Sequence, residues 1–268
     1  MNINQSLARG LRILEAIAAH GPEMGVRELA RLLELDKSIV SRLVVTLAEH
    51  GFLQKNMATR RYRVGPRAHE VGQKYAASNP LYEIANDDLH SLAEQEGLNV
   101  YLSVRSDTSV LYLCAIQSAQ PSVLRIGTGV TGKLHTTAVG KVLLAAMDDD
   151  ALKKLLKRLP LSRLTPHSIT KESALLAELK MVRKNGYSQS DEENLVGILS
   201  IGAPIRDASG TIVAAVSTAV NKQGHDKKFF KRMVQLTEHV AGSISTKLGA
   251  PPASPFAYLD ERKKRAAA

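Results

Sequence analysis

The sequence predicts an α+β protein in which a small N-terminal winged helix-turn-helix domain precedes a larger sandwich of helices on a mainly antiparallel sheet. Three observations support this fold class. Helical patterns fill the first 50 residues, a basic hairpin pattern follows them, and apolar strands alternate with helices from residue 81 onward. A chain of 268 residues with 44% hydrophobic residues can build the cores of two domains.

Three helices are predicted before residue 51. The second, over residues 25–35, opens with Gly25 as a permissible N-cap, and the third begins behind Asp36 and ends at Gly51. These two helices of about three turns, joined by a minimal turn, match the helix-turn-helix spacing. The apolar face of the first helix, over residues 6–20, is formed by Leu7, Leu11, Leu14, Ile17 and Ala18.

A hairpin and a linker helix follow these helices. The segments FLQK and RRYRVG are typical of two short strands, and the polar turn NMAT separates them. A basic hairpin directly after the second helix of such a pair is a wing, so the winged domain is expected over residues 1–65. PRAHEVGQKYAAS then predicts a linker helix over residues 66–79, opened by Pro66 and broken at Asn79-Pro80.

From Leu81 the pattern changes to strands separated by short turns, which predicts an α+β layer sandwich with a mainly antiparallel sheet over residues 80–249. The tail, residues 250–268, is rich in Pro, Ala and basic side chains and is expected to be flexible. The predicted helices are residues 81–97, 134–147, 150–159, 172–186 and 227–248. The predicted strands are residues 98–105, 109–117, 121–127, 195–206 and 211–220.

The charge of the chain favours a polyanionic partner. The formal net charge is +10, and residues 1–78 hold 12 Lys or Arg against 7 Asp or Glu. Such an excess indicates nucleic acid or a membrane surface. A membrane-surface helix needs a strong apolar face beside its basic one, and Phe229 and Phe230 of the candidate KKFFKRMVQL are better used in a core. We therefore expect nucleic acid and no membrane partner.

The expected compartment is the cytoplasm. No segment reaches the roughly 18 to 20 apolar residues of a membrane helix, and the N-terminus lacks the apolar stretch of a signal peptide. The single cysteine, Cys114, lies in an apolar strand pattern and is interpreted as a core residue.

An enzyme is the main rival class, because His135 stands beside Thr136, Thr137 and Lys141 in the larger domain. Nucleophilic catalysis requires a base and an orienting carboxylate around the nucleophile, and no G-x-S-x-G elbow occurs. The eight histidines show no metal-ligand spacing. No catalytic residue, metal or cofactor is therefore predicted.

Several motifs occur in a specific order. The N-terminal half contains SLARGLRILEAIA, VRELARLLELDKSIVSRLVVTLAEHGFLQ and RRYRVGP, and the C-terminal half contains GKLHTTAVGKVLLA, TPHSIT and RKNGYSQSDEENLVGILSIGAPI. With these motifs the chain resembles the IclR-type bacterial transcription regulators along residues 5–248. The resemblance implies a DNA-binding domain joined by a helix to an effector domain with a GAF/PAS-like sandwich, assembled as a homo-dimer or a tetramer and acting as a repressor or an activator.

The expected DNA contacts lie at the start of the helix over residues 37–50 and near the tip of the wing, where side chains meet base edges and phosphates of a double-stranded operator. The alternative is that these are ordinary solvated positions. Ile39 stands where the family usually has Thr, and Ser41 where a larger polar residue is frequent, which leaves the operator sequence open. The expected contacts are Lys37, Ser38, Ser41, Arg42, Arg60 and Arg61.

The larger domain is expected to bind a small organic or aromatic acid. LHTTAVGKVLLAA places a turn before a helix whose free N–H groups attract a carboxylate. The resemblance adds polar pocket positions on the strands, where Ser190 replaces an acid and Ala219 a hydroxyl, which suggests a ligand with a larger apolar part. The expected effector contacts are Thr137, Ala138, Val139, Ser190, Ile198, Ser200, Ser217 and Ala219.

Two questions stay open at this stage. Each serine is as compatible with a satisfied strand hydroxyl as with a ligand contact, and Glu192 and Glu193 are either solvated loop charges or residues that order the pocket rim. A homo-oligomer is expected in any case, because one winged helix buries too little surface for a specific site, and two-fold pairing doubles its contacts. The first helix and the linker helix are the expected pairing surfaces.

Overall fold

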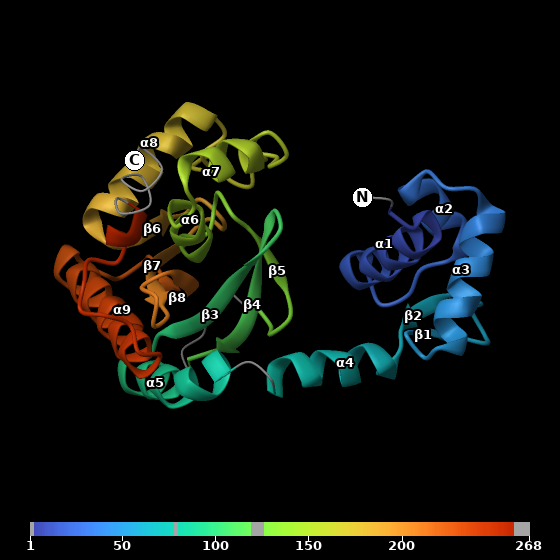
Figure 1. Cartoon of the computed structure of the whole chain (residues 1–268), viewed down its shortest axis with the longest axis horizontal. Helices are drawn as coiled ribbons and strands as arrows, with labels where there is room; N and C mark the ends of the chain where they lie inside the picture. Colours follow the sequence, from blue (N-terminus) through green and yellow to red (C-terminus); the bar gives the residue numbers. More distant parts are fainter. Residues whose placement is uncertain (1–2, 78–79, 119–125, 260–268) are drawn as a thin grey trace. The chain divides into compact units, whose positions relative to one another are not determined.

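The computed structural model describes residues 3–77, 80–118 and 126–259, and the chain divides into two compact units, residues 1–79 and 80–268 (Figure 1). Among these described residues, no helix has both the length and the apolar character needed to cross a membrane.

The N-terminal unit is the predicted winged helix-turn-helix domain. Its core joins all three leading helices to the hairpin through Ile13, Leu29, Val40, Leu53 and Tyr62, each almost fully buried. A short bridge between Met24 and Tyr62 ties the chain before α2 to the hairpin. The elements are α1 Gln5–His20, α2 Val26–Leu33, α3 Lys37–Glu49, β1 Leu53–Lys55, β2 Tyr62–Val64 and α4 Pro66–Ala77.

The buried face of α1 differs from the predicted one. Leu7 and Leu11 are 63% and 50% exposed, whereas Ile13 and Ile17 lie in the core. Helix α1 packs on α3 and β2, and the buried Gly10 belongs to this packing face. The predicted face is therefore only partly right: Leu14 and Ile17 belong to the core or pack against it, Leu7, Leu11 and Ala18 do not, and Ile13 was missed.

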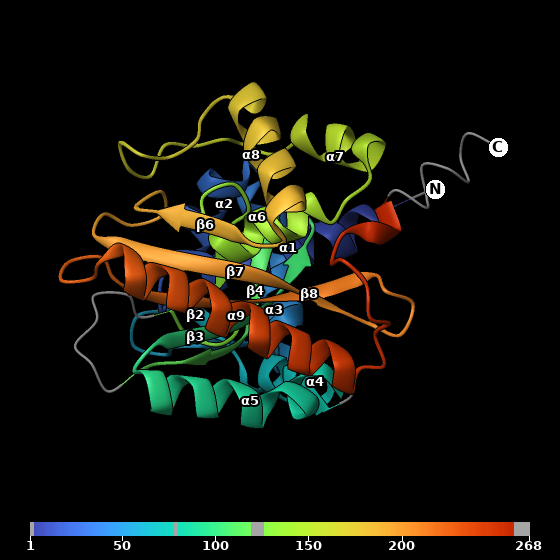
Figure 2. The ribbon, with the colours of Figure 1, turned by 90° about the vertical axis from the view of Figure 1, so that its left-hand side faces the viewer.

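The C-terminal unit is a three-layer sandwich around a six-stranded sheet of order β5-β4-β3-β8-β7-β6, in which every pairing is antiparallel. Helices α5 and α9 cover one face, and α6, α7 and α8 lie over the other (Figures 1 and 2). The mainly antiparallel sheet is confirmed, and the likeness to GAF/PAS sandwiches stays a prediction. The elements are α5 Pro80–Glu96, β3 Asn99–Ser106, β4 Ser109–Ile116, β5 Thr131–Lys133, α6 Ala138–Ala145, α7 Asp149–Leu156, α8 Glu172–Asn185, β6 Ser188–Asp191, β7 Ile198–Arg206, β8 Ile212–Asn221 and α9 Lys227–Lys247.

Two strands and one helix boundary differ from the sequence analysis. The two edge strands β5 and β6 were not predicted, because they are three and four residues long and mostly polar. Helix α6 begins at Ala138 rather than at residue 134, since the side chain of Thr137 caps it. The strand predicted over residues 121–127 and the break at Asn79 lie mostly or wholly outside the described residues.

The tail is not flexible over its first ten residues. Phe256 and Leu259 are buried in the core beneath α7 and α8, and the Tyr258 hydroxyl donates a hydrogen bond to the carbonyl of Ala146. The prediction of a flexible tail is therefore wrong for residues 250–259, because its few apolar side chains find a place in the core. Residues 260–268 lie outside the described part of the chain.

The turn between α2 and α3 depends on a left-handed residue. Glu34 ends α2 with φ 54° and ψ 45°, and its N–H bonds the carbonyl of Ala30. Side chains with a Cβ adopt this conformation at a cost, and Gly adopts it freely. Packing of the helices thus holds Glu34 in this unfavourable conformation and so maintains the short turn of the helix-turn-helix.

We expect Glu34→Gly to stabilise the N-terminal unit by about 1 kcal/mol, because it relieves the left-handed strain and the gain exceeds the added freedom of the unfolded chain. Native-state hydrogen exchange of α3 amides in the full chain measures this difference. Glu34→Ala is the matched control: it removes the same charge, keeps the Cβ, and should give no stabilisation. Equal exchange rates in the glycine variant and the wild type would contradict the strain.

Candidate functional site

The start of α3 is an exposed polar surface. Val40 and Val44 are fully buried and fix the inner face of the helix, Leu43 packs beside them, and the polar residues of the first turns are exposed. Neither Lys37 nor Arg42 forms an ion pair with any residue that the structure describes. The helix therefore presents unneutralised cations next to hydroxyl groups. The exposed side chains are Lys37, Ser38, Ser41 and Arg42.

The two wing arginines have different environments. Arg61 donates to both carboxylate oxygens of Glu28, at 3.1 and 2.7 Å, and to the backbone carbonyl of Glu23 at 3.0 Å. Arg60 is exposed, adopts a left-handed backbone with φ 55°, and has no side-chain partner in the described ranges. Arg60 thus extends toward solvent, and Arg61 holds the wing against α2.

Glu28 connects the wing to the start of α2. The Gly25 N–H, which donates to the carboxylate at 3.0 Å, and then Arg61 hold the pKa of Glu28 below its usual value. A lowered folded-state pKa means that this interaction stabilises the unit at neutral pH and is lost as the pH falls through that pKa. The wing is therefore fixed in position at physiological pH.

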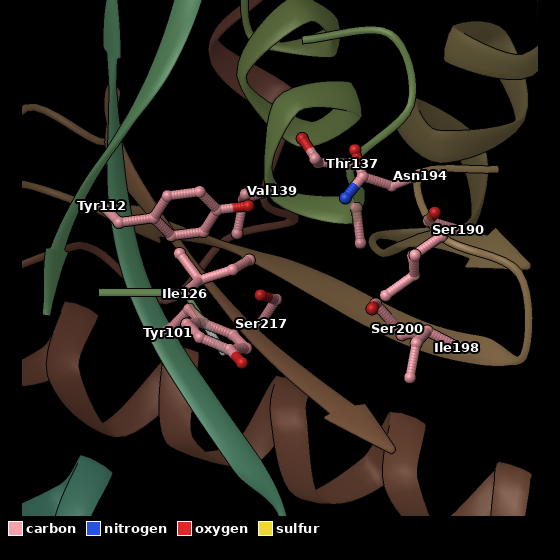
Figure 3. A pocket seen from close by; sticks show the side chains of 12 residues that line it. Tyr101, Tyr112, Ile126, Thr137, Val139, Ser190, Asn194, Ile198, Ser200 and Ser217 are labelled. Atoms are coloured by element: carbon pink, nitrogen blue, oxygen red, sulfur yellow. The ribbon is translucent and has the colours of Figure 1, made fainter. Parts of the chain in front are cut away.

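The C-terminal unit contains a narrow pocket between the N-terminus of α6 and the sheet, with a free volume of about 20 Å³ (Figure 3). Seven of the eight predicted effector contacts line it, and Ala219 does not, because it lies buried farther along β8. Tyr101, Tyr112, Ile126, Asn194 and Leu195 were not predicted. The lining residues are Tyr101, Tyr112, Ile126, Thr137, Ala138, Val139, Ser190, Asn194, Leu195, Ile198, Ser200 and Ser217.

The N-terminus of α6 presents unpaired N–H groups to the pocket. The Thr137 hydroxyl accepts a hydrogen bond from the N–H of Gly140 at 3.2 Å and donates to the carbonyl of Lys133 at 2.7 Å. The N–H groups of Ala138 and Val139 have no acceptor among the described residues. The sheet approaches this end closely: a Cβ on Gly202 would lie 2.8 Å from the Ala138 carbonyl carbon. Unpaired helix N–H groups in a pocket are a binding site for an anion.

Two tyrosines form the opposite wall. The rings of Tyr101 and Tyr112 pack edge to face, with centroids 5.5 Å apart, and the buried Tyr101 hydroxyl has no hydrogen-bond partner in the described structure. Burial raises the pKa of Tyr101 to about 12 and raises that of Tyr112 as well. Both hydroxyls are therefore neutral donors. The signal that could have found them is a tyrosine inside each of two neighbouring strands, since a buried phenol requires a polar partner.

Some of the remaining polar side chains of the pocket already hydrogen-bond the protein, and others have groups free to bond a ligand. Ser190 donates to the carbonyl of Thr136 at 2.7 Å, so its hydroxyl is satisfied by the protein. The hydroxyls of Ser200 and Ser217 make no hydrogen bond to a described residue. Asn194 accepts from the Thr136 hydroxyl at 3.1 Å through Oδ1, which leaves its amide N–H groups available to the pocket (Figure 3). Serines that looked alike in the sequence thus have different roles.

A buried ion pair supports the pocket from behind α6. Lys141 is 1% exposed, and its Nζ lies 2.6 Å from Glu193 and 2.9 Å from Glu178. Burial raises the pKa of Glu193 against the opposing charge of Lys141. An uncompensated charge here would be strongly destabilising, so the pair holds α6 to the loop that carries Glu193.

Glu192 orders the same loop from its outer side. Its Oε2 accepts from the N–H of Gly197 at 2.9 Å, and its Oε1 lies 2.7 Å from Lys222. The loop between them carries Asn194 and Leu195 to the pocket. Of the two readings of these glutamates, the geometry supports the one in which they order the pocket rim.

His135 belongs to the packing of the domain. It is fully buried, its Nε2 lies 2.9 Å from the carbonyl of Ser162, and burial lowers its pKa, so it is neutral. Within residues 3–77, 80–118 and 126–259, no three His, Cys, Asp or Glu side chains gather to hold a metal ion.

A winged helix with an exposed cationic helix, followed by a sandwich that encloses a donor-rich pocket, defines the class of ligand-responsive DNA-binding proteins. The sequence profile of the IclR helix-turn-helix domain matches residues 6–56, and that of the bacterial transcriptional regulator IclR C-terminal domain matches residues 73–246. The chain belongs to the IclR family of bacterial transcriptional regulators. It is a DNA-binding regulator with a C-terminal effector-binding domain, and it is not an enzyme.

The similarity to known proteins extends over most of the chain. The transcriptional repressor IclR of Escherichia coli (strain K12) is 31% identical over 217 residues, which are 80% of this chain and 78% of the relative. The regulator BhcR of Paracoccus denitrificans is 31% identical over 215 residues, 80% of this chain and 77% of its own. The crystal structure of the Thermotoga maritima IclR has a TM-score of 0.67 at 29% identity and covers 91% of this chain and 98% of that one.

Proposed function

We propose that this regulator binds an operator in double-stranded DNA through α3 and the wing, and that a small organic acid in the pocket of the C-terminal domain changes its operator affinity. The protein acts in the cytoplasm as a homo-dimer or a tetramer. The observation that carries the effector proposal is that one pocket is lined both by Ala138 and Val139, whose N–H groups are unpaired, and by Tyr101, whose hydroxyl is unpartnered.

The proposed DNA contacts rest on exposure and charge. Lys37 and Arg42 are exposed cations on the first turns of α3, with Ser38 and Ser41 beside them, which is where a recognition helix meets base edges and phosphates. Arg60 extends from the wing. We assign Arg61 the task of holding the wing through Glu28, and this changes its predicted role from a contact to a positioning residue.

Arg42→Ala and Arg60→Ala should weaken operator binding. Loss of a phosphate contact should weaken all duplexes alike and flatten the salt dependence by about one unit, and loss of a base contact should cost about tenfold at one base pair. Fluorescence anisotropy with a duplex selected by the wild type from a random-sequence library measures both effects. Arg163→Ala, an exposed arginine of the other domain, is the matched control. Wild-type affinity in both folded arginine variants would refute the assignment.

The chemistry of the pocket selects an anion with an apolar body. The polar groups free to bind a ligand are hydrogen-bond donors, namely two helix N–H groups, an amide and hydroxyls. The side chains of Ile126, Leu195 and Ile198 form an apolar part of the pocket wall. A helix N-terminus contributes about 0.3 to 2 kcal/mol toward an anion, and burial of the apolar part supplies the rest. An IclR homolog from Microbacterium hydrocarbonoxydans, 22% identical in sequence, was solved in complex with 4-hydroxybenzoate, which makes this acid a reasonable first probe.

Ser217→Phe should abolish the response to the acid and leave unliganded DNA binding intact, because it fills the pocket without touching the winged domain. Tyr101→Phe is the gentler variant: it removes an unpartnered hydroxyl, should keep the stability of the fold, and should lower ligand affinity about two- to tenfold. Tyr82→Phe, with a half-exposed ring on α5, is its control.

Calorimetry with benzoate, 4-hydroxybenzoate and short aliphatic acids provides the readout, together with the operator affinity of each variant. We expect a bound acid to change the affinity for the operator about 5- to 150-fold. Binding of no carboxylate by the wild type, or an unchanged response in Ser217→Phe, would show that the effector site is elsewhere or that the effector is not an acid.

The outer stripe of α1 supports the oligomer. Leu7 and Leu11 are exposed there, and Val71 and Tyr75 of α4 are 53% and 51% exposed in the same unit. Apolar stripes on two helices of a DNA-binding unit fit a second copy of this chain, since two-fold pairing presents two recognition helices to one operator.

Light scattering at micromolar concentration should give at least twice the chain mass of 29.1 kDa for the wild type. The double variant Leu7→Lys, Leu11→Lys should lower the mass, because two buried charges oppose the apolar contact. Val196→Lys, at a 60% exposed position of the other domain, should change nothing. A monomeric wild type would disprove the proposal.

A further inference from the structure

The tip of the wing carries an apolar side chain that the proposed DNA contacts do not use. Met57 is 81% exposed, more than any other large hydrophobic residue of the described chain. It stands in the turn between β1 and β2. Single exposed apolar residues are common, so its exposure alone decides nothing. What distinguishes Met57 is how rigidly the turn is held and what surrounds it.

The turn is fixed by a single carboxylate. Asn56 Oδ1 accepts from the N–H groups of Ala58 and Thr59, at 3.0 and 3.3 Å. Glu23 binds both ends of this turn, since its Oε1 accepts from Asn56 Nδ2 at 2.9 Å and its Oε2 from the Thr59 hydroxyl at 3.0 Å. The hydrogen bond from Asn56 holds the pKa of Glu23 below its usual value, so the carboxylate is charged at neutral pH. Met57 is therefore presented on a pre-organised turn.

Cations flank the methionine. Lys55 precedes the turn and Arg60 follows it, both exposed, and Arg60 keeps a left-handed backbone that costs free energy for an arginine. Of the two carboxylates beside the hairpin, Glu28 is paired with Arg61, and Glu23 keeps one negative charge where it accepts hydrogen bonds from Asn56 and Thr59. The wing tip is thus an apolar point between two positive charges.

We propose that Met57 enters the minor groove of DNA beside the segment that α3 contacts, with Lys55 and Arg60 on the phosphates that line the groove. The minor groove is narrow and its two phosphate walls are anionic, and methionine is among the side chains that proteins insert there. The amino group of guanine projects from the floor of this groove, so an inserted methionine favours A·T over G·C pairs. Met57 is therefore a specificity-determining residue for base pairs outside the recognition-helix site. This inference rests on the proposed DNA binding through α3.

The test uses the full-length protein and a duplex that the wild type selects from a random-sequence library. Pairs flanking the α3 site are changed from A·T to G·C and then to inosine·C, which restores an A·T-like minor groove while keeping the major groove of G·C. The wild type should lose affinity with G·C and regain it with inosine·C. Met57→Ala should bind the selected duplex about tenfold more weakly and show no such pattern, with an unchanged salt slope.

Two further variants complete the experiment. Met57→Leu keeps an apolar tip and should retain the inosine response, and Met181→Ala, a 47% exposed methionine on α8, should behave as wild type. Because Met57 is exposed, its alanine variant should melt at the wild-type temperature, which separates a lost contact from a lost fold.

The outcomes separate this inference from the proposed function. If Met57→Ala keeps wild-type affinity and the inosine pattern while Arg42→Ala weakens binding, the minor-groove role of Met57 is wrong, and the proposed DNA binding through α3 is supported. If Met57→Ala weakens all duplexes alike with a flatter salt slope, the wing binds phosphates only, which also overturns the proposal. If neither variant changes binding, DNA recognition through α3 itself fails.

Discussion

The C-terminal domain depends on the immobilisation of one short helix. All eight residues of α6 are buried, and its middle is tied to the pocket loop and to α8 by Lys141, which bonds Glu193 and Glu178. Its last carbonyls are bound by Arg183, which donates to Ala145 at 2.8 Å, and by the hydroxyl of Tyr258. A buried ion pair contributes little net stability, but it specifies one position for the groups it joins. Here it determines where the free N–H groups at the start of α6 point, and therefore the shape of the pocket.

Left-handed backbone conformations occur at the proposed sites of both domains and also at Asp107, in the turn between β3 and β4. Three residues with a Cβ adopt left-handed conformations at sites discussed above: Glu34 in the turn of the helix-turn-helix, Arg60 in the wing and Glu192 at the pocket rim. Two of them are held by hydrogen bonds of their own: the Glu34 N–H donates to the carbonyl of Ala30, and Glu192 accepts from the N–H of Gly197. Such conformations persist only where the neighbouring structure enforces them, and they concentrate at binding sites.

Periodicity predicted nearly every helix and the antiparallel sheet, because their buried faces recur at fixed spacing. It placed Leu7 and Leu11 of α1 in the core together with Ile17, since an apolar residue looks the same in the sequence whether it faces the core or the surface. Most of the pocket followed from motifs, whereas Asn194 did not, because its place depends on a contact with Thr136, 58 residues away. The bond between Arg61 and Glu28 is likewise a long-range pairing that charge counting cannot reveal. Local pattern therefore gives the elements, and only tertiary contacts tell which polar groups remain free.

The packing of residues 250–259 has a consequence for the order of events during synthesis. Every core contact of the winged unit lies within its own residues, and N-terminal domains generally fold first on the ribosome. The carbonyl of Ala146, at the end of α6, meets the Tyr258 hydroxyl only after 112 further residues have been made. The winged unit can thus be folded while the effector-binding domain is still being assembled. A newly made chain therefore passes through a stage in which the helix-turn-helix domain is folded while the end of α6, and with it the pocket, still lacks the support of the C-terminal residues.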